Sequence, residues 1–374
     1  MSGIAAYVRG WFNEPAPTFE SRTASARWAT TQPRHARHVL RVAAVIDETP
    51  STRTYVLSAP DGGKPALAYR AGQHLTLLVD AGGATQRRCY SFSSSPLSDA
   101  LPAITVKRAA DGTVSRHLHE RVHVGDTLTA LEPTGEFTPA TDAHAQRHLV
   151  LVAGGVGITP LVSIAETVLR TEPASRVTLL TGNRSEDEIV FRARLDALAA
   201  EFQPRLVVRH ALDVAPPGWN GLHGALDGAR VVGALDLATA DGFYVCGPEP
   251  MMQSVCAALE SAGVPRDRIH TERFAYASAA TTRIPDHSAA ITFATSGRRI
   301  TARAGQTLLQ AGLEAGIDLP SSCTMGGCGA CKVHKRAGTV VMSEPNCLGE
   351  HERDAGYVLA CCTYAETDVV IDGY

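Results

Sequence analysis

The spacing of hydrophobic and polar positions changes twice along the chain. Between residues 39 and 138, short segments rich in β-branched residues alternate with glycine turns such as those at 61–63 and 81–83. The clearest of these segments are 74–79, 104–106 and 127–131. Many short strands with turns at such spacing predict an antiparallel β-barrel.

From residue 148 onward, continuous apolar segments alternate with helical patterns. The predicted strands are 149–153, 177–181, 206–208 and 242–245, and the predicted helices are 160–170, about 189–200 and about 250–262. Strands that are apolar on both faces and separated by helices are typical of a doubly wound parallel α/β domain.

The last part of the chain predicts a small α+β domain. A hairpin is expected over 290–294 and 299–303, a helix over 307–315 and a final strand over 369–372. The predicted organisation is an N-terminal extension at 1–37, the barrel at 38–145, the α/β domain at 146–276, a linker at 277–288 and the small domain at 289–374. In the extension, arginines outnumber acidic residues. It is expected to wrap a neighbouring domain or to contact a partner or an anionic membrane weakly.

Composition excludes several classes of function. The 374 residues carry a net charge of −3, so no global basic field favours nucleic acid. No apolar run approaches the roughly 18 residues of a membrane helix, and the first residues lack the pattern of a secretory signal. A cytoplasmic protein is therefore expected.

Nine cysteines are present, and six of them follow residue 322. Cys323, Cys328 and Cys331 have the spacing C-x4-C-x2-C, which together with a distant fourth cysteine is typical of plant-type 2Fe–2S sites. Glycines within this loop allow tight turns whose N–H groups can point at sulfur. Cys361 and Cys362 compete for the fourth position, and zinc is the rival metal.

A second constellation suits a flavin, which has an apolar ring and an anionic phosphate tail. Arg88-Cys-Tyr-Ser91 is followed by Gly112-Thr-Val-Ser115 and by Pro133-Thr-Gly-Glu-Phe137. An arginine can pair with phosphate, a tyrosine can stack on the ring, a serine can reach a ring nitrogen, and Ser115 can hold a phosphate at a helix N-terminus. The four-residue motif alone fits an ordinary exposed strand equally well.

A third constellation suits a pyridine dinucleotide. Ala153-Gly-Gly-Val-Gly-Ile-Thr-Pro160 joins a buried strand to a helix, where glycines admit a pyrophosphate and the helix N-terminus attracts it. Another buried strand ends in Tyr244-Val-Cys-Gly-Pro-Glu-Pro-Met251, where a small cysteine precedes a glycine. Arg184 could pair with a 2′-phosphate, but the acidic residues 186–188 would repel one, so NADH is favoured over NADPH only slightly.

In this order, the motifs over residues 38–374 resemble the ferredoxin–NADP reductase superfamily with a C-terminal plant-type ferredoxin domain of the β-grasp type. The resemblance implies that the cluster ligands are Cys323, Cys328, Cys331 and Cys361. It implies a flavin, FAD rather than FMN, held by Arg88, Tyr90, Ser91, Val106, Lys107, Val114 and Ser115. It implies nucleotide contacts by Gly154, Gly155, Gly157, Thr159, Pro160, Arg184, Cys246, Gly247, Pro248 and Met251. Ser91 and Cys246 are the expected catalytic residues, and Glu272 and Phe274 match an E-x-F ending of the nucleotide domain.

The cofactor order implies an electron-transfer reductase. A nicotinamide gives two electrons together and a 2Fe–2S cluster takes one, so a flavin is needed between them. The expected acceptor is a separate oxygenase, hydroxylase, demethylase or desaturase. Two alternatives remain open: a redox-sensing protein of the same composition, and a reductase whose acceptor is oxygen or a quinone.

Overall fold

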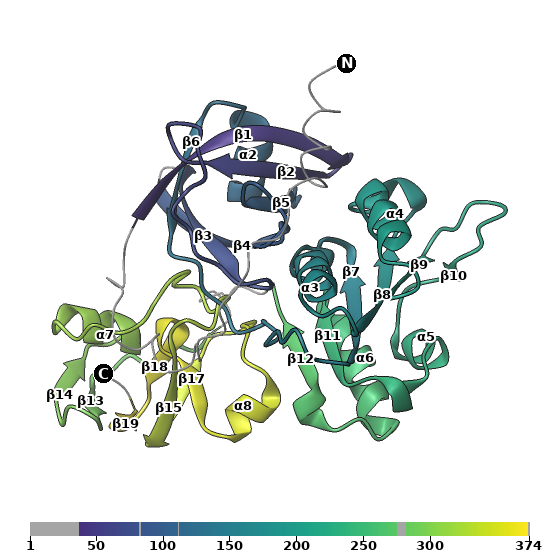
Figure 1. The fold of residues 1–374 in the computed structure, drawn as a ribbon. Coiled ribbons are helices and arrows are strands. Elements are labelled where there is room, and N and C mark those ends of the chain that lie inside the picture. Colours follow the sequence, from purple (N-terminus) through teal and green to yellow (C-terminus); the bar gives the residue numbers. More distant parts are fainter. Residues whose placement is uncertain (1–36, 82–83, 111, 275–281, 373–374) are drawn as a thin grey trace. The chain divides into compact units, whose positions relative to one another are not determined.

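The fold is described from a computed structural model, which covers all residues except 1–36, 82–83, 111, 275–281 and 373–374 (Figure 1). The chain divides into two compact units, Met1–Glu272 and Arg273–Tyr374. The predicted N-terminal extension, apart from Arg37, and the first residues of the predicted linker lie outside the described residues. Within the described part, no helix combines the length and the hydropathy that crossing a membrane requires.

The first unit begins with the predicted antiparallel barrel. Its six-stranded sheet has the order β4-β3-β6-β1-β2-β5, and an isolated bridge between Phe92 and Ile104 joins the two edge regions. The side chains of Tyr55, Phe92 and Ile104 are completely buried in its core. The elements are β1 (Arg37–Thr49), β2 (Thr52–Ser58), β3 (His74–Ala81), β4 (Ala84–Ser91), β5 (Ala103–Lys107), α2 (Thr113–Arg121) and β6 (Thr127–Leu131).

The same unit continues with a six-stranded parallel sheet of order β10-β9-β8-β7-β11-β12. The chain runs outward from β7 to β10 and then returns to place β11 on the other side of β7. The strand order therefore reverses between β7 and β11, the position where open α/β sheets bind ligands beyond their carboxyl ends. The strands are β7 (His148–Gly154), β8 (Arg176–Asn183), β9 (Leu206–Leu212), β10 (Leu222–His223), β11 (Gly242–Cys246) and β12 (Ile269–Glu272).

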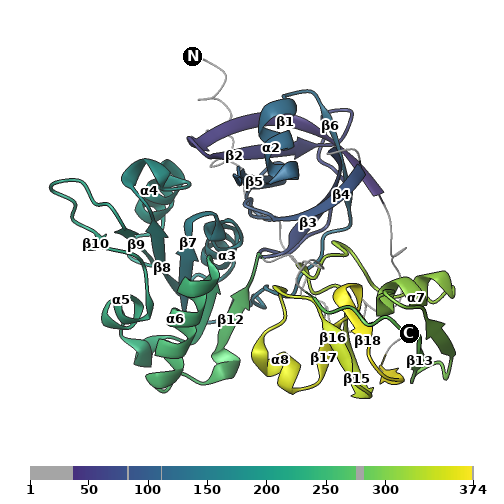
Figure 2. The ribbon, with the colours of Figure 1, turned by 180° about the vertical axis from the view of Figure 1, so that it is seen from behind.

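Helices cover both faces of this sheet, which explains its uniformly apolar strands (Figure 2). Leu149 and Leu151 pack in one cluster with α3 and α4, whereas Val150 and Val152 pack in another with α5 and α6. The helices are α3 (Ile158–Thr171), α4 (Arg192–Glu201), α5 (Gly228–Gly233) and α6 (Glu249–Ser261). The second begins three residues later than predicted, because Phe191 adopts a left-handed backbone with φ of +62° that interrupts a helix.

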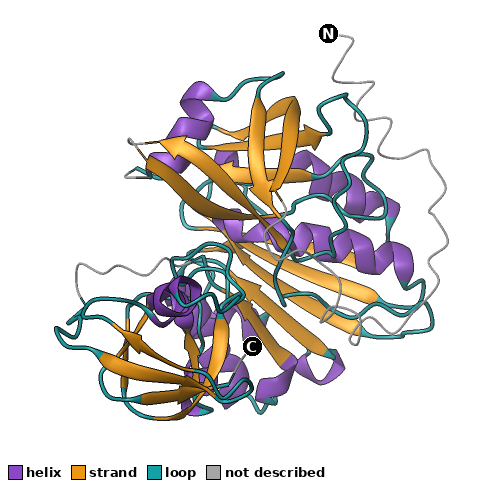
Figure 3. Ribbon diagram, turned by 90° about the vertical axis from the view of Figure 1, so that its left-hand side faces the viewer, coloured by secondary structure: helices purple, strands orange, loops and turns teal. Residues whose placement is uncertain are grey.

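The second unit has the predicted α+β architecture. A five-stranded sheet of order β14-β13-β19-β15-β17 pairs β13 with β19 in parallel, and α7 packs on its core (Figure 3). Thr307 and Gln310 form a capping box at the start of this helix. The elements are β13 (Ala289–Phe293), β14 (Arg299–Ala302), α7 (Leu308–Glu314), β15 (Lys332–Ala337), β16 (Val340–Met342), α8 (Glu350–Asp354), β17 (Tyr357–Leu359), β18 (Thr363–Ala365) and β19 (Val369–Ile371).

Two glycines of the barrel share a left-handed backbone but differ in their surroundings. Gly72 and Gly62 have φ of +91° and +93°; a Cβ at Gly72 would lie 2.0 Å from the carbonyl oxygen of Phe137, whereas a Cβ at Gly62 meets nothing within 4 Å. We expect Gly72→Ala to lower the free energy of unfolding by about 1–3 kcal/mol more than Gly62→Ala, the usual cost of overpacking. Denaturant titration followed by circular dichroism measures this difference, and equal losses would contradict it.

Candidate active site

The glycine turn between β7 and α3 packs tightly against the loop after β11. A Cβ added at Gly157 would lie 2.3 Å from the carbonyl oxygen of Cys246, and one at Gly154 would lie 2.5 Å from Cδ of Pro248. Glycine is therefore required for the two loops to approach this closely. A Cβ at Gly155 would instead meet nothing within 4 Å. The turn thus has one packed side and one open side, at the point where the strand order reverses.

The neighbouring predicted nucleotide residues take their places in these two loops. Thr159 and Pro160 are buried in the first turn of α3, where the Thr159 hydroxyl donates to the carbonyl of Val156 at 3.1 Å. Gly247 faces Met251 across the second loop. The side chains of Thr159 and Pro160 therefore shape the turn, while the N–H groups at the start of α3 offer an anion site.

Cys246 ends β11 between the two strands that flank it. It pairs with Ala153 at the end of β7 and with Glu272 at the end of β12, and its side chain is fully buried. Burial raises the pKa of the Cys246 thiol well above its ordinary range, and the Glu272 carboxylate adds to this effect. The group at this position is therefore a neutral thiol at physiological pH.

The flavin motif on β4 reaches the same place. The hydroxyl of buried Ser91 donates to Oε2 of Glu272 at 3.2 Å, across a sequence separation of 181 residues. The two predicted catalytic residues, Ser91 and Cys246, therefore both neighbour Glu272. The sequence indicated Glu272 only as part of the E-x-F ending, because nothing local to it shows which hydroxyl it meets.

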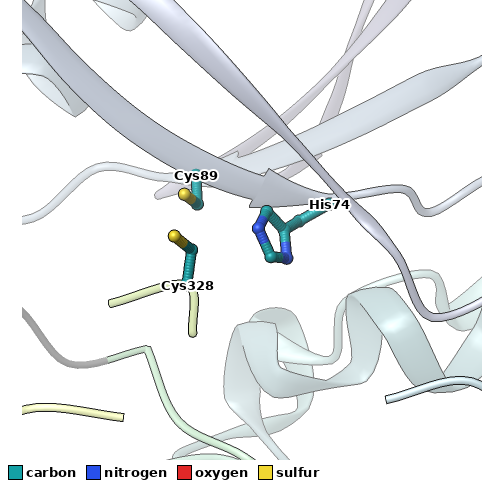
Figure 4. A group of neighbouring side chains, drawn as sticks. All are labelled: His74, Cys89 and Cys328. Atoms are coloured by element: carbon teal, nitrogen blue, oxygen red, sulfur yellow. The ribbon is translucent and has the colours of Figure 1, made fainter. Parts of the chain in front are cut away.

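His74 at the start of β3 also faces this carboxylate, and no sequence motif singled it out. Its Nδ1 lies 3.7 Å from Oε1 of Glu272 and its Nε2 lies 3.3 Å from Oγ1 of Thr134. Figure 4 shows His74 on β3 and Cys89 on the adjacent β4; the sulfur of Cys89 is 3.2 Å from the hydroxyl of Thr76.

Arg88 and Tyr90 stand on β4 as the motif predicts. Both side chains are half-buried; Nη2 of Arg88 donates to Oε1 of Gln86 at 3.0 Å. Tyr90 packs against the barrel core, and burial raises the pKa of its hydroxyl. The tyrosine is therefore a neutral aromatic side chain that can provide a stacking surface.

The other predicted flavin residues differ in what they can offer. Val106 and Val114 are buried in the barrel core. Lys107 is exposed, with Nζ 3.6 Å from Oε2 of Glu188. The hydroxyl of Ser115, in the first turn of α2, accepts from the N–H of Ala109 at 3.2 Å.

Arg184 directly follows β8, whose Gly182 pairs with Gly154 at the start of the glycine turn. Its side chain is exposed, and beside it a cavity of about 830 Å³ is lined by Ser185, Glu186, Asp187, Arg192 and residues 214–217. Glu186 pairs with Arg192 at 3.1 Å. The cavity therefore carries a partly neutralised acidic edge.

In the second unit, the loop of Cys323 directs backbone N–H groups at sulfur. Cys323 Sγ accepts from the N–H groups of Met325 and Gly327 at 3.4 and 3.3 Å, and Cys361 Sγ accepts from Gly326 at 3.1 Å. Thr324 has φ of +59°, a strained conformation for a β-branched residue. Such strain is typical of loops that are held in one shape by a functional constraint.

The two adjacent cysteines at the fourth position differ in their contacts. Cys361, in the short 3-10 turn Ala360–Cys362, has its thiol within hydrogen-bonding reach of the thiols of Cys323, Cys331 and Cys362. The thiol of Cys362 also donates to the carbonyl of Leu359 at 3.7 Å. Cys328 Sγ accepts from the N–H of Cys323 at 3.5 Å. Four thiols with N–H donors around them fit a 2Fe–2S cluster.

Cys347 lies close to the same loop. Burial raises the pKa of its thiol to about 12, and the neighbouring Cys323 and Cys331 add to this effect. Its N–H donates to the carbonyl of Gly326 at 2.8 Å. Cys347 therefore supports the loop through its backbone while its thiol stays neutral.

Three family models match this chain in succession. They are the oxidoreductase FAD-binding domain at residues 40–138, the oxidoreductase NAD-binding domain at 151–257 and the 2Fe-2S iron-sulfur cluster binding domain at 291–366. Each match contains the motif that predicted the corresponding cofactor, so the predicted fold class and cofactors are confirmed.

Curated relatives match nearly the whole chain. The ferredoxin reductase component of 3-ketosteroid-9-alpha-monooxygenase from Rhodococcus rhodochrous is 36% identical, with 88% of this chain and 95% of the relative covered. A component of the 1,2-phenylacetyl-CoA epoxidase from Escherichia coli is 34% identical, with 90% and 97% covered.

Solved structures give the same result. Phthalate dioxygenase reductase, described as a modular structure for electron transfer from pyridine nucleotides to [2Fe-2S], matches with a TM-score of 0.57 and 25% identity, covering 91% of this chain and 98% of that one. A self-sufficient cytochrome P450 monooxygenase matches with a TM-score of 0.66 and 27% identity, but the match covers 90% of this chain and only 41% of that longer protein. This chain therefore belongs to the ferredoxin-reductase type of oxidoreductases, in which FAD-binding and NAD-binding domains precede a 2Fe–2S domain.

Proposed function

We propose that this protein oxidises NADH at an FAD held by the barrel and delivers the electrons, through its 2Fe–2S domain, to a separate terminal oxygenase. The observation that carries the proposal is the meeting of Ser91, Glu272 and Cys246, because it joins the flavin motif to the strand ends of the nucleotide sheet. Bound FAD accepts two electrons from a nicotinamide as hydride and releases them singly, as a 2Fe–2S cluster requires.

The residues of the first unit supply binding and alignment. The N–H groups of the Gly155–Gly157 turn and of the start of α3 bind the dinucleotide pyrophosphate. Arg88 pairs with a flavin phosphate and Tyr90 stacks on the ring. Cys246 limits the space for the nicotinamide without adding a charge, since its thiol is neutral.

Ser91 and Glu272 place a polar pair beside the flavin motif. The Ser91 hydroxyl donates its one hydrogen to Glu272 at 3.2 Å, so it can donate to a flavin ring nitrogen only by turning away from this bond. The Glu272 side chain is 14% exposed. The pair therefore keeps the Ser91 hydroxyl next to the proposed position of the ring.

NADH is proposed over NADPH because of the charge at the predicted ribose end. The cavity beside Arg184 is bordered by Glu186 and Asp187, and only Glu186 has a close cation. A 2′-phosphate placed there would face uncompensated carboxylate charge, whereas a 2′-hydroxyl could donate to a carboxylate.

The cluster ligands proposed are Cys323, Cys328, Cys331 and Cys361. The curated relatives from Rhodococcus rhodochrous and Escherichia coli are components of oxygenating systems, by their descriptions a monooxygenase and an epoxidase. We therefore propose a separate terminal oxygenase as the electron acceptor. The wider class of acceptors that would need such a reductase includes hydroxylases, demethylases and desaturases.

The electron route is tested with the purified holoprotein under anaerobic conditions. NADH is expected to bleach both flavin and iron–sulfur absorbance, faster than NADPH at equal concentration. Cys323→Ser should abolish cytochrome c reduction, because the one-electron exit is lost, and retain most ferricyanide reduction from the flavin. Equal loss of both activities would show that the cluster is structural, and an unreactive flavin would refute the proposed function.

The fourth ligand is tested by comparing two adjacent cysteines. After reduction with dithionite, Cys361→Ala should lack the rhombic electron paramagnetic resonance signal of a 2Fe–2S cluster, because one thiolate is missing. Cys362→Ala, a matched removal of a buried thiol, should keep the signal within about 20% of wild type. A signal lost only in Cys362→Ala would reverse the assignment.

The glycine turn is tested at Gly157. Gly157→Ala forces the turn away from the carbonyl of Cys246, so we expect kcat/KM for NADH to fall at least tenfold, about 1.4 kcal/mol. Gly233→Ala is the control, because a Cβ there meets nothing within 4 Å in the same domain. Its kcat/KM should stay within twofold of wild type; if Gly157→Ala also stays within twofold, the close packing of the turn does not matter for binding.

A further inference from the structure

A buried arginine lies between the two domains of the first unit. Arg194 on α4 is only 10% exposed, and its Nη2 lies 3.1 Å from Oδ2 of Asp99 and 2.7 Å from Oε2 of Glu166. Its Nη1 donates to the carbonyl of Ser93 at 2.8 Å. Both carboxylates are at most 5% exposed. One guanidinium therefore binds three acceptors out of contact with bulk water.

These acceptors come from different domains. Ser93 and Asp99 lie in the segment matched by the FAD-binding model, whereas Glu166 and Arg194 lie in the segment matched by the NAD-binding model. The guanidinium thus crosses the boundary between the flavin barrel and the nucleotide sheet. This contact is within one compact unit, so both domains are placed together.

Hydroxyl groups continue the same boundary along α3. Ser163 donates to the carbonyl of Ser94 at 2.6 Å, and the hydroxyls of Ser95 and Thr167 are 2.8 Å apart. Ser98 donates to Oε1 of Glu166 at 2.7 Å. We refer to these bonds, together with those of Arg194, as the α3 seam.

The α3 seam joins two segments that lead directly to the reactive groups. Ser93 follows Ser91 of the flavin motif by two residues, and α3 begins at Ile158, immediately after the glycine turn. The helix α3 is regular, whereas residues 93–99 form an irregular turn in which Ser93, Ser94 and Ser95 are buried. Because these buried groups are bonded to α3, a shift at the seam moves the flavin motif relative to the turn. Hydride transfer needs reacting atoms about 3–3.5 Å apart, and a displacement of 1 Å can cost roughly 100-fold in rate.

The charges of the seam depend on the arginine. Burial raises the pKa of Asp99 to about 6, and the Arg194 guanidinium opposes this rise and keeps the group ionised at neutral pH. Burial also acts on Glu166, but the attraction and hydrogen bond of Arg194, with smaller contributions from the Ser98 hydroxyl and Arg170, outweigh it and lower the pKa of that carboxyl. A buried ionic cluster adds little net stability compared with apolar packing, yet its fixed hydrogen-bond directions select one arrangement of the parts that it joins.

We propose that Arg194 is a positioning residue for hydride transfer, which holds the flavin motif in register with the nucleotide turn through Ser93, Asp99 and Glu166. The proposal rests on the proposed NADH-to-FAD reaction. It predicts that weakening the seam slows the hydride step more than it weakens nucleotide binding, and leaves electron exit from reduced flavin unchanged.

The test uses the full-length holoprotein and two seam variants. Arg194→Lys keeps the charge but loses the planar fork, and Asp99→Asn removes one charge on the barrel side with little change of shape. Arg205→Lys is the matched control: Arg205 donates to the carbonyls of Leu169, Glu172 and Ser175, all within the nucleotide domain. It therefore reports the cost of weakening an arginine that does not cross the boundary.

Three measurements separate positioning from stability. Anaerobic stopped-flow gives the limiting rate of flavin reduction and the apparent Kd for NADH, with C4-deuterated NADH to identify the hydride step. Reoxidation of dithionite-reduced protein by ferricyanide gives the exit step. Hydrogen exchange of the amides at 93–99 and 158–167 reports the seam itself, without turnover.

For both seam variants we expect the limiting rate to fall at least tenfold, the apparent Kd to change less than threefold and reoxidation to stay within twofold. Exchange at 93–99 should accelerate at least fivefold. Arg205→Lys should stay within twofold in all kinetic steps, even if its Tm falls. If Arg194→Lys fails to retain FAD, the rate constants and the apparent Kd of Asp99→Asn alone test the proposal.

The proposal would be overturned if Asp99→Asn kept a limiting rate of flavin reduction within twofold of wild type. Equal losses in flavin reduction and in reoxidation by ferricyanide would also overturn it. Failure of the proposed function has a different signature: wild-type flavin would not be reduced by NADH at all. In that case hydrogen exchange still tests whether the α3 seam holds residues 93–99 in place. Unchanged exchange at 93–99 in Asp99→Asn would refute this role of the seam, and accelerated exchange would support it.

Discussion

Hydride transfer requires two ring systems at van der Waals distance, and this requirement governs the arrangement of the first unit. The flavin motif ends β4, whereas the nucleotide residues end β7 and β11 of a different sheet. Glu272 at the end of β12 contacts both, through the Ser91 hydroxyl and through its pairing with Cys246. The position where the strand order reverses is therefore also the position where the barrel meets the sheet.

The turn after β7 and the loop after β11 can lie close together because glycines leave out side chains at their contact and because the nearby side chains are small. Gly154 and Gly157 let the turn after β7 lie directly on the loop after β11. A neutral thiol at Cys246 and a buried hydroxyl at Ser91 add little volume and no charge. Small uncharged groups therefore lie at these strand ends, next to the carboxylate of Glu272 and the imidazole of His74.

The sequence predicted what is encoded by neighbouring residues. The barrel, the parallel sheet, the α+β domain and the cysteine loop follow from periodicity and from spacings of a few residues. The bond between Ser91 and Glu272 spans 181 residues, and the Arg194–Asp99 pair spans 95. No local pattern marks such partners, because an arginine in a helix usually faces solvent. The late start of α4 was missed for a similar reason. Phe191 adopts a left-handed backbone, which phenylalanine rarely does, so its residue type gave no sign of the interruption.

The two cofactor regions therefore differ in how they tolerate change. In the second unit, the proposed cluster ligands come from a loop of nine residues and one later cysteine, and N–H groups of that loop bind the sulfurs of Cys323 and Cys361. In the first unit, alignment depends on bonds between distant segments, so a substitution on α4 can alter chemistry at β4 without contacting either cofactor. An apolar boundary of equal area would resist separation but would permit sliding, since apolar contacts have no fixed direction. The hydrogen bonds of the α3 seam have fixed directions, so they hold the barrel and the nucleotide sheet in one relative orientation. A hydride step of fixed geometry needs this orientation.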